Sequence, residues 1–478
     1  MLLSPLRLRT SCAMLTLACV SVTAAERPPA ASQSKPNILF VFADDQRADT
    51  IAALGNPRIQ TPNLDRLVRR GLSFNRAYMM GGMNVATCIP SRAMLLSGRS
   101  LFHIDEKLTR DETWPAAFGR AGYTTFISGK WHNTPDAVPL SFQRARNLFT
   151  GGMINPLKAP LSSLENGLMG PATVSSKHAC EVFADETIAF LKEKHATPFF
   201  AYLPFDGPHD PHIVPDDYPV RYDPAKLPLP ENYLPQHPFN NGEMTVRDEQ
   251  LLPWPRTAAD IRAMTADYYR YISYLDMLIG RVLDTLDASP YAKNTVVVFS
   301  SDSGVARGSH GLIGKQNLYE HSLRVPLILA GPGIPANQTT EAMCYLFDVF
   351  PTLGALSGIA GPKTSEGLDL SATLRNPAAP ARPLLMFAYQ RLQRALRDER
   401  YKLIRYPQVD LTQLFDLVAD PFERTDLSAR SEHAARITAM SAALAAEMKH
   451  LDDPAELTVA TTRPAAWSPP PAHGKMQP

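Results

Sequence analysis

Short, continuous apolar runs recur along the chain, and each is bounded by polar residues. The first, at 37–43, reads Asn-Ile-Leu-Phe-Val-Phe-Ala. Similar runs lie at 124–128, 198–205 and 295–301, and a fifth candidate lies at 325–330. A run of this length without alternating polar residues is typical of a strand buried on both faces of a parallel sheet. The pattern therefore predicts a central sheet whose two faces are both covered.

Helical patterns lie between these runs. Residues 180–194 form one candidate helix, and residues 258–286 form a long amphipathic one. Alternation of strands with helices is typical of an α/β domain. At 478 residues, the chain is long enough for such a domain and a smaller second unit. Residues 206–256, dense in proline and polar residues, predict a long ordered loop that shapes a cleft.

From about residue 384 the pattern changes to short strands followed by one helix. The candidates are strands at 385–389, 401–406 and 413–417 and a helix at 432–450. We therefore expect a larger domain at 36–383 and a smaller α+β subdomain at 384–452. The remaining residues, 453–478, are rich in Pro, Ala and Thr, which predicts a disordered tail.

The first 25 residues have the layout of a secretory signal. Two arginines precede an apolar stretch at 13–22, and small residues end at Ala25, where we expect cleavage. The apolar stretch is shorter than the roughly 20 residues of a membrane-spanning helix, and no later run approaches that length. We expect a secreted or periplasmic protein. Leu17-Ala18-Cys19 loosely resembles a lipoprotein processing site, so a lipid anchor through Cys19 is the second reading.

The net charge and the cysteine content bear on two questions, nucleic-acid binding and disulfide formation. A formal net charge of +1 with no long basic run gives no electrostatic footprint for nucleic acid, so any anion site must be local. Of five cysteines, two lie in the expected signal. Cys180 and Cys344 could form a disulfide in an oxidising compartment, a question that the sequence leaves open.

Chemically capable side chains follow four of the apolar runs. They are Asp44 and Asp45 after the first, Lys130 and His132 after the second, His209 after the third and Asp302 after the fourth. Taken singly, each could start a turn, cap a helix or be solvated. In open α/β sheets, however, ligands bind outside the carboxyl ends of the strands. The presence of such residues after four predicted strands therefore predicts one cleft in which these residues converge.

Residues 88–98 read Cys-Ile-Pro-Ser-Arg-Ala-Met-Leu-Leu-Ser-Gly. Proline is tolerated in the first turn of a helix, so Pro90 predicts that Cys88 lies at a helix start. Arg92 follows one turn later on the same face, and its guanidinium can reach back towards residue 88. The helix N-terminus and Arg92 together favour an anion there. The alternative is a buried structural cysteine.

This stretch resembles the Cys-x-Pro-Ser-Arg signature of the type I sulfatases. Further motifs similar to that family follow in the family's order, namely Gly129-Lys130-Trp131-His132, Pro208-His209-Asp210-Pro211, Ser301-Asp302-Ser303-Gly304 and Gly314-Lys315 leading to Tyr319-Glu320. The resemblance spans about residues 36–450. It implies the alkaline-phosphatase-like fold, with a catalytic domain at 36–383 and a C-terminal subdomain at 384–452.

The resemblance also implies a mechanism. A maturation enzyme would oxidise Cys88 to formylglycine, whose hydrated aldehyde carries two hydroxyls: one attacks sulfur, and the other lets the aldehyde re-form as sulfate leaves. Arg92 and His132 would hold the diol, and Asp302 or the metal would help to deprotonate it. Lys130, His209 and Lys315 would grip the sulfate oxygens, with His209 as the expected proton donor to the leaving oxygen.

A metal site is expected beside the nucleophile. Asp44, Asp45 and Asp302 offer only oxygen ligands, which suit a hard divalent cation, and without one they would repel each other. The resemblance implies calcium, with magnesium less favoured, and adds residue 88 and the residue after the last Asp as ligands. In the family the latter is Asn or His, whereas here it is Ser303. A water could fill the gap, or the metal could be held less tightly.

Two other functions stay open at this stage. A phosphatase or phosphonate monoester hydrolase of the same superfamily is the nearest, although two-zinc phosphatases need Ser or Thr as nucleophile and several His ligands. A secreted binding protein that has lost the reaction is the second. The substrate is expected to be a sulfated glycan, with a small aryl or alkyl sulfate as the alternative. We expect His212 and His310 to have structural or substrate-side roles.

Overall fold

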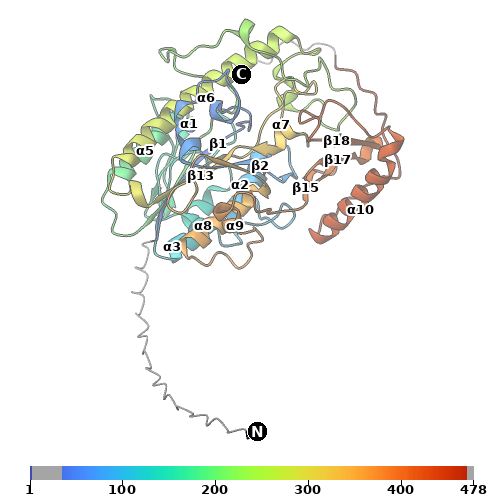
Figure 1. The fold of residues 1–478 in the computed structure, drawn as a ribbon. Coiled ribbons are helices and arrows are strands. Elements are labelled where there is room, and N and C mark those ends of the chain that lie inside the picture. Colours follow the sequence, from blue (N-terminus) through green and yellow to red (C-terminus); the bar gives the residue numbers. More distant parts are fainter. Residues whose placement is uncertain (3–34, 471–478) are drawn as a thin grey trace. The chain divides into compact units, whose positions relative to one another are not determined.

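The computed structural model describes residues 1–2 and 35–470, and a nine-stranded mixed sheet forms the centre of the latter range (Figure 1). The expected secretory signal, apart from its first two residues, lies outside the described residues, and so does the alternative anchor site at Cys19.

Four of the predicted strands lie side by side at the middle of this sheet. They are β1 (Asn37–Ala43), β4 (Thr124–Ile127), β10 (Phe199–Pro204) and β11 (Thr295–Ser301). Their order is β11-β1-β10-β4, and every adjacent pair is parallel. Ala43 pairs with Ser301, and Phe42 pairs with Pro204. The carboxyl ends of these strands therefore meet at one edge of the sheet, as the sequence predicts.

The fifth predicted strand differs from the expectation. Pro326, which has no N–H to donate, separates β12 (Arg324–Val325) from β13 (Leu327–Ala330). β13 runs antiparallel to β11 and to β2 (Gly71–Tyr78), and β14 (Gln338–Tyr345) pairs with β2. Neither β2 nor β14 was predicted. At the other edge of the sheet, β5 (Arg144–Ala145) pairs with β4.

Helices cover both faces of the sheet (Figure 1). On β1, Leu39 and Val41 face the layer formed by α1 (Pro62–Arg70), α5 (Ala179–Lys192) and α6 (Ala258–Asp287). Ile38 and Phe40 face the opposite layer, formed by α2 (Cys88–Ser97), α3 (Trp114–Arg120) and α8 (Val349–Ser357). This two-sided burial explains why the strands read as continuous apolar runs. The shorter helices are α4 (Val138–Ser141), α7 (Glu320–Leu323) and α9 (Ser371–Arg375).

The C-terminal part forms a second sheet, drawn in orange and red in Figure 1. Its order is β18-β17-β16-β15-β3, with β15 (Leu385–Tyr389), β16 (Gln393–Arg397), β17 (Tyr401–Tyr406) and β18 (Leu411–Asp416), and α10 (Ala434–His450) packs on it. β16 was not predicted, because its charged residues mask the strand pattern. β3 (Gly81–Gly82) comes from the N-terminal part of the chain and pairs with β15. A Cβ at Gly81 would lie 1.9 Å from the Ala388 carbonyl oxygen, so this pairing requires glycine.

Residues 453–470 differ from the expected disordered tail, because they lie against the rest of the chain. The Asp453 carboxylate accepts a hydrogen bond of 2.9 Å from Nη2 of Arg394. The Asn240 amide donates to the Ala465 carbonyl at 2.8 Å, and the Trp467 ring meets Trp254 edge to face. Residues 471–478 lie outside the described part of the chain.

Two further sequence questions are answered by the structure. Cys180 and Cys344 are both buried and free, so they do not form a disulfide. The region 206–256 is an ordered loop, as predicted, with short 3₁₀ turns at Pro224–Lys226 and Arg247–Leu251 and a β-bridge from Tyr233 to Ser309.

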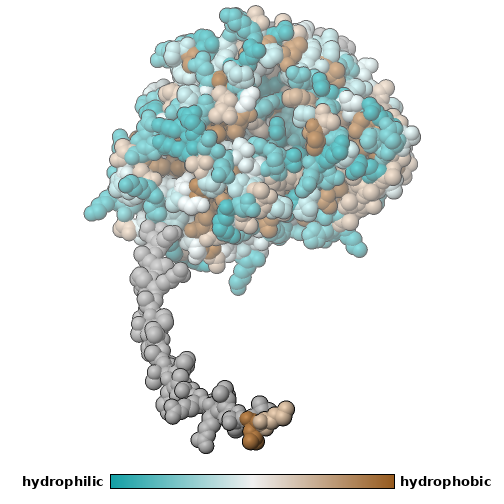
Figure 2. Space-filling view, in the orientation of Figure 1, coloured by the Kyte–Doolittle hydropathy of each residue, from teal (hydrophilic) through white to brown (hydrophobic). Residues whose placement is uncertain are grey.

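No helix within the described ranges is long and apolar enough to cross a membrane. Hydrophilic residues cover most of the face drawn in Figure 2, and the apolar residues on it form small groups.

The Arg394–Asp453 pair gives a test of how residues 453–470 are held. Both side chains are almost inaccessible to solvent, at 1% and 0% exposure. Asp453→Asn leaves a buried guanidinium without its counter-charge and should lower the free energy of unfolding by about 2–4 kcal/mol. The measurement is chemical denaturation followed by circular dichroism.

The matched control is Asp452→Asn. The Asp452 side chain is 80% exposed and its carboxylate bonds to His103, so its loss should cost less than about 1 kcal/mol. Equal effects of the two variants would contradict a packed C-terminal segment.

Candidate active site

Three carboxylates meet where β1 and β11 end. Asp44 and Asp45 directly follow β1, and Asp302 directly follows β11. Asp45 has a left-handed backbone with φ of 63°, which is strained for a residue with a Cβ. Two hydrogen bonds hold this turn: the Asp45 amide donates to Asp302 Oδ1 at 3.0 Å, and the Tyr268 hydroxyl donates to the Asp45 carbonyl at 2.6 Å. The strain thus serves to bring the Asp45 side chain beside Asp302.

Cys88 is the first residue of α2, as the position of Pro90 predicts. Its side chain is only 1% exposed. The thiol lies 3.4 Å from Asp44 Oδ1, and Lys315 Nζ lies 2.9 Å from the sulfur. One ligand atom each from Asp44, Asp45, Cys88 and Asp302 lies within 4.8 Å of all the others. Residues separated by more than 200 positions in the sequence therefore form one compact cluster.

Three buried cations balance the three carboxylates. Arg92 donates to Asp44 Oδ2 at 2.7 Å and to Asp302 Oδ2 at 3.0 Å. Lys130 Nζ lies 2.7 Å from Asp44 Oδ2, and Lys315 Nζ lies 2.6 Å from Asp45 Oδ1. Arg92 therefore contacts two of the carboxylates that lie around Cys88.

These charges set the protonation states in the cluster. For Asp44, burial acts to raise the pKa, but Lys130 and Arg92 hold it well below its usual range. For Asp302, burial and the neighbouring Asp44 raise the pKa to about 6. Burial, together with Asp302 and Asp44, also raises the pKa of the Cys88 thiol well above its ordinary value. Because the thiolate is the nucleophilic form, unmodified Cys88 is a poor nucleophile here.

The two predicted histidines flank the cluster. His209 Nε2 lies 3.7 Å from Asp45 Oδ2, and its Nδ1 bonds to the Asp210 carbonyl at 2.7 Å. His132 packs against Gly152, whose carbonyl accepts from Lys130 Nζ. Burial, with the nearby Lys130, lowers the pKa of His132 to about 2, so this ring is neutral.

Ser303, which stands where the sulfatase pattern has Asn or His, points into the cluster. It is fully buried, and its hydroxyl donates to Asp45 Oδ1 at 2.7 Å. The serine therefore contacts one of the expected metal ligands.

The donor set fits a hard divalent cation. Its carboxylate oxygens converge from three aspartates, and an oxygen at residue 88 would complete an all-oxygen shell. Lys130 and Lys315 form ion pairs with two of the same carboxylates, so a bound cation would share Asp44 and Asp45 with these ammonium groups.

The loop at 206–256 supplies positioning residues that the sequence did not reveal. Arg247 pairs with Asp210, beside His209, and with Asp248. The buried Glu249 carboxylate accepts from the Gly314 amide at 2.8 Å and from the Ile313 amide at 3.0 Å, and so fixes the segment that carries Lys315. The sequence predicted that this loop shapes the cleft, but it gave no signal for these individual residues.

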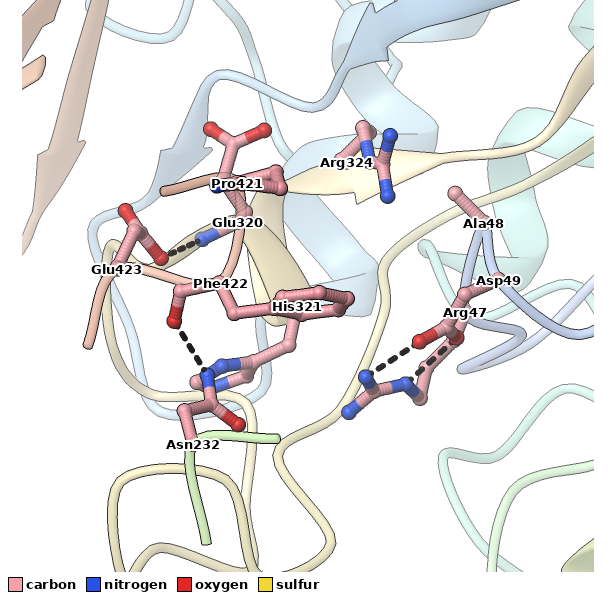
Figure 3. A pocket seen from close by; sticks show the side chains of 10 residues that line it. All are labelled: Arg47, Ala48, Asp49, Asn232, Glu320, His321, Arg324, Pro421, Phe422 and Glu423. Atoms are coloured by element: carbon pink, nitrogen blue, oxygen red, sulfur yellow. Dashed lines mark hydrogen bonds and ion pairs between the residues drawn. The ribbon is translucent and has the colours of Figure 1, made fainter. Parts of the chain in front are cut away.

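His310 lies in a different group. Its ring stacks on Tyr319 at 3.9 Å and lies 5.7 Å from His321. His321 lines the cavity of Figure 3, where Arg47 and Asp49 stand on one side and Asn232, Phe422 and Glu423 on the other. Among the residues that the structure describes, His310 is not part of the metal-ligating cluster.

The fold is mixed α/β, of the alkaline-phosphatase-like type, and the acidic cluster lies where its central strands end. The family model described as sulfatase matches residues 36–359, and a model described as N-sulphoglucosamine sulphohydrolase, C-terminal, matches residues 308–450. The chain belongs to the sulfatase family and is an enzyme that hydrolyses sulfate esters.

Relatives match over most of their length. An ulvan-active sulfatase of Formosa agariphila is 29% identical over 450 residues, which cover 88% of this chain and 82% of the relative. An N-acetylglucosamine-6-O-sulfatase of Bacteroides thetaiotaomicron is 25% identical and covers 90% of this chain and 89% of its own. The solved structure of a phosphonate monoester hydrolase of Agrobacterium radiobacter superposes with a TM-score of 0.70 at 22% identity, over 87% of this chain and 96% of that one. The last likeness shows the fold alone.

Proposed function

We propose that this sulfatase removes a sulfate group from a glycan, with formylglycine derived from Cys88 as nucleophile and a calcium ion beside it. The observation that carries the proposal is the convergence of three aspartates and Cys88 within 4.8 Å. A glycan substrate is supported by relatives named for ulvan and for N-acetylglucosamine 6-sulfate. A small aryl or alkyl sulfate is the alternative.

The proposal includes a maturation enzyme that oxidises Cys88, and a secreted or periplasmic location that follows from the signal layout at 1–25. A lipid anchor through Cys19 is the alternative location. Formylglycine, as its hydrated aldehyde, supplies one hydroxyl that attacks sulfur and a second through which sulfate is released.

The chain's own residues have the following proposed roles. Arg92 and His132 orient residue 88, and Asp302 takes a proton from it. Lys130 and Lys315 neutralise the sulfate oxygens, which is supported by their closeness to the carboxylates around Cys88. His209 donates a proton to the leaving oxygen from Nε2, because its Nδ1 already bonds to the Asp210 carbonyl. Asp44, Asp45, Asp302 and residue 88 hold the cation, with Ser303 at its edge.

A phosphonate ester hydrolase is the second candidate, favoured by the shared fold with the Agrobacterium enzyme. Comparing kcat/KM on a sulfate monoester and on a phosphonate monoester separates the two. A protein that binds without reacting is not supported, because the chain belongs to the sulfatase family and brings the nucleophile, the carboxylates and both lysines together.

The first test concerns residue 88. Conversion of its SH group to an aldehyde should lower the mass of the Cys88 peptide by about 18 Da in protein from the native host, and Cys88→Ala should be folded but inactive. Mass spectrometry and a sulfatase assay measure these outcomes. The peptides of Cys180 and Cys344, the other buried free thiols, are internal controls and should keep their unmodified mass. Substantial activity of the alanine variant would end the hypothesis.

The second test concerns the metal. Chelation should abolish activity, and calcium should restore it better than zinc, because the ligands are all oxygen. Ser303→Asn adds a carbonyl ligand at the edge of the cluster and should tighten calcium binding roughly 10-fold in titration calorimetry. Stoichiometric zinc in the active enzyme would contradict the calcium assignment. Unchanged affinity of the asparagine variant would mean that Ser303 is not at a ligand position.

The third test separates His209 from the lysines. A general acid matters most when the leaving group is basic, so His209→Ala should cost on the order of 100-fold in kcat/KM on a sugar sulfate but little on a nitrophenyl sulfate. Lys130→Ala and Lys315→Ala, which remove charge stabilisation, should lower kcat/KM alike on both substrates. Substrates with leaving groups of graded pKa give the measurement. A uniform loss for His209→Ala would show that it only binds sulfate.

A further inference from the structure

A small cavity of about 20 Å³ adjoins the acidic cluster, because Asp45 belongs to both. Asp210, His212, Tyr268 and Arg307 also line it. A substrate whose sulfate lies at the cluster would present a neighbouring group to this cavity, so the charges of the lining affect which substrates fit.

Arg307 is unlike the other buried arginines of the described chain. Arg92, Arg256, Arg394 and Arg397 each form an ion pair with a carboxylate. Arg307, at 6% exposure, has no carboxylate within 4.0 Å in the described residues, and its Nε has no hydrogen-bond partner there. A buried charge without a counter-charge costs several kcal/mol. The protein therefore keeps a buried guanidinium without a direct ion pair beside its active site.

Neutral groups hold the Arg307 guanidinium in place. It donates to the Met264 carbonyl and, at 3.3 Å, to His212 Nε2, and it stacks on the Tyr268 ring at 4.0 Å. Burial, then the nearby Arg307, lowers the pKa of His212 to about 3, so this ring stays a neutral acceptor. The arginine also has a left-handed backbone with φ of 52°. Backbone strain of this kind, at a residue whose side chain is already fixed by three contacts, is typical of a functional position.

Each of the other charged side chains of the cavity lining has a partner of opposite charge within ion-pair distance. Arg247 pairs with both Asp210 and Asp248, and Lys315 pairs with Asp45. Arg307 is therefore the charge in this lining that lacks a partner within the described residues. A guanidinium presents a planar fork of N–H donors that suits the oxygens of a carboxylate or a sulfate.

We propose that Arg307 binds a second anionic group of the substrate, either the carboxylate of a uronic acid or a second sulfate, while the first sulfate is cleaved. This specificity rests on the proposed sulfatase function and deepens it: the substrate is a glycan unit with two negative groups.

The test compares four sulfate esters with the mature, calcium-loaded enzyme. They are a nitrophenyl sulfate, a neutral sugar monosulfate, the same sugar with a second sulfate and the corresponding uronate sulfate. The wild type should have a kcat/KM roughly 10-fold or more higher on at least one doubly charged sugar than on the neutral one. A preference for the disulfated sugar would indicate that Arg307 binds a second sulfate, and a preference for the uronate sulfate would indicate that it binds a carboxylate.

Arg307→Gln should lower kcat/KM on the preferred doubly charged sugar by about 10- to 100-fold and leave the nitrophenyl sulfate within about 2-fold. Arg307→Lys keeps the charge but loses the planar fork of donors. Its kcat/KM on the doubly charged sugar should therefore lie between those of the wild type and Arg307→Gln. Arg324→Gln is the matched control, because Arg324 lines the separate cavity of Figure 3 and should leave the substrate ratio unchanged.

Two outcomes would overturn the inference: no preference of the wild type for a second anionic group, or an equal loss on all four esters in Arg307→Gln. The wild-type comparison stands even if the glutamine variant fails to fold. Both outcomes presuppose activity on sulfate esters. An enzyme with matured residue 88 and calcium that cleaves none of the four would instead refute the proposed function, and the inference with it.

Discussion

The neutralisation of three carboxylates at one edge of the sheet is the constraint on which the rest of this structure depends. Asp44, Asp45 and Asp302 are all buried, and each would be costly to ionise alone. Arg92, Lys130 and Lys315 approach from α2, from the turn after β4 and from the segment after β11. The architecture that surrounds the cluster serves to hold these three cations at hydrogen-bonding distance.

This constraint also explains the role of more distant residues. The Glu249 carboxylate, from the long loop, binds the backbone next to Lys315, and Tyr268 on α6 bonds to the Asp45 carbonyl. Both fix the direction from which a charged side chain enters the cluster. The parts of the chain that carry no reacting group therefore still determine the electrostatic balance at the site.

The sequence predicted the four central strands because burial on both faces leaves an unbroken apolar run. It predicted the convergence of Asp44, Lys130, His209 and Asp302 because parallel strands share an edge. The strands β2, β14 and β16 were missed, since their polar residues break that pattern. Arg247, Glu249 and Arg307 were missed for another reason: Asp210, the Gly314 amide and His212, which they contact, lie far away in the sequence, so only the folded chain brings them together. The tail at 453–470 was misjudged because its composition suggests disorder, while Asp453 and Trp467 have partners that only the fold supplies.

The pairing of β3 with β15 has a consequence for the evolution and engineering of this chain. Gly81 and Gly82 lie only seven and six residues before Cys88, yet their backbone completes a sheet built otherwise from residues 385–416. The segment that leads into the nucleophile is thus anchored on the C-terminal sheet. The N-terminal part and the C-terminal sheet therefore cannot be exchanged independently between relatives. A chain cut near residue 384 would lose the strand β15 that pairs with the segment leading into Cys88.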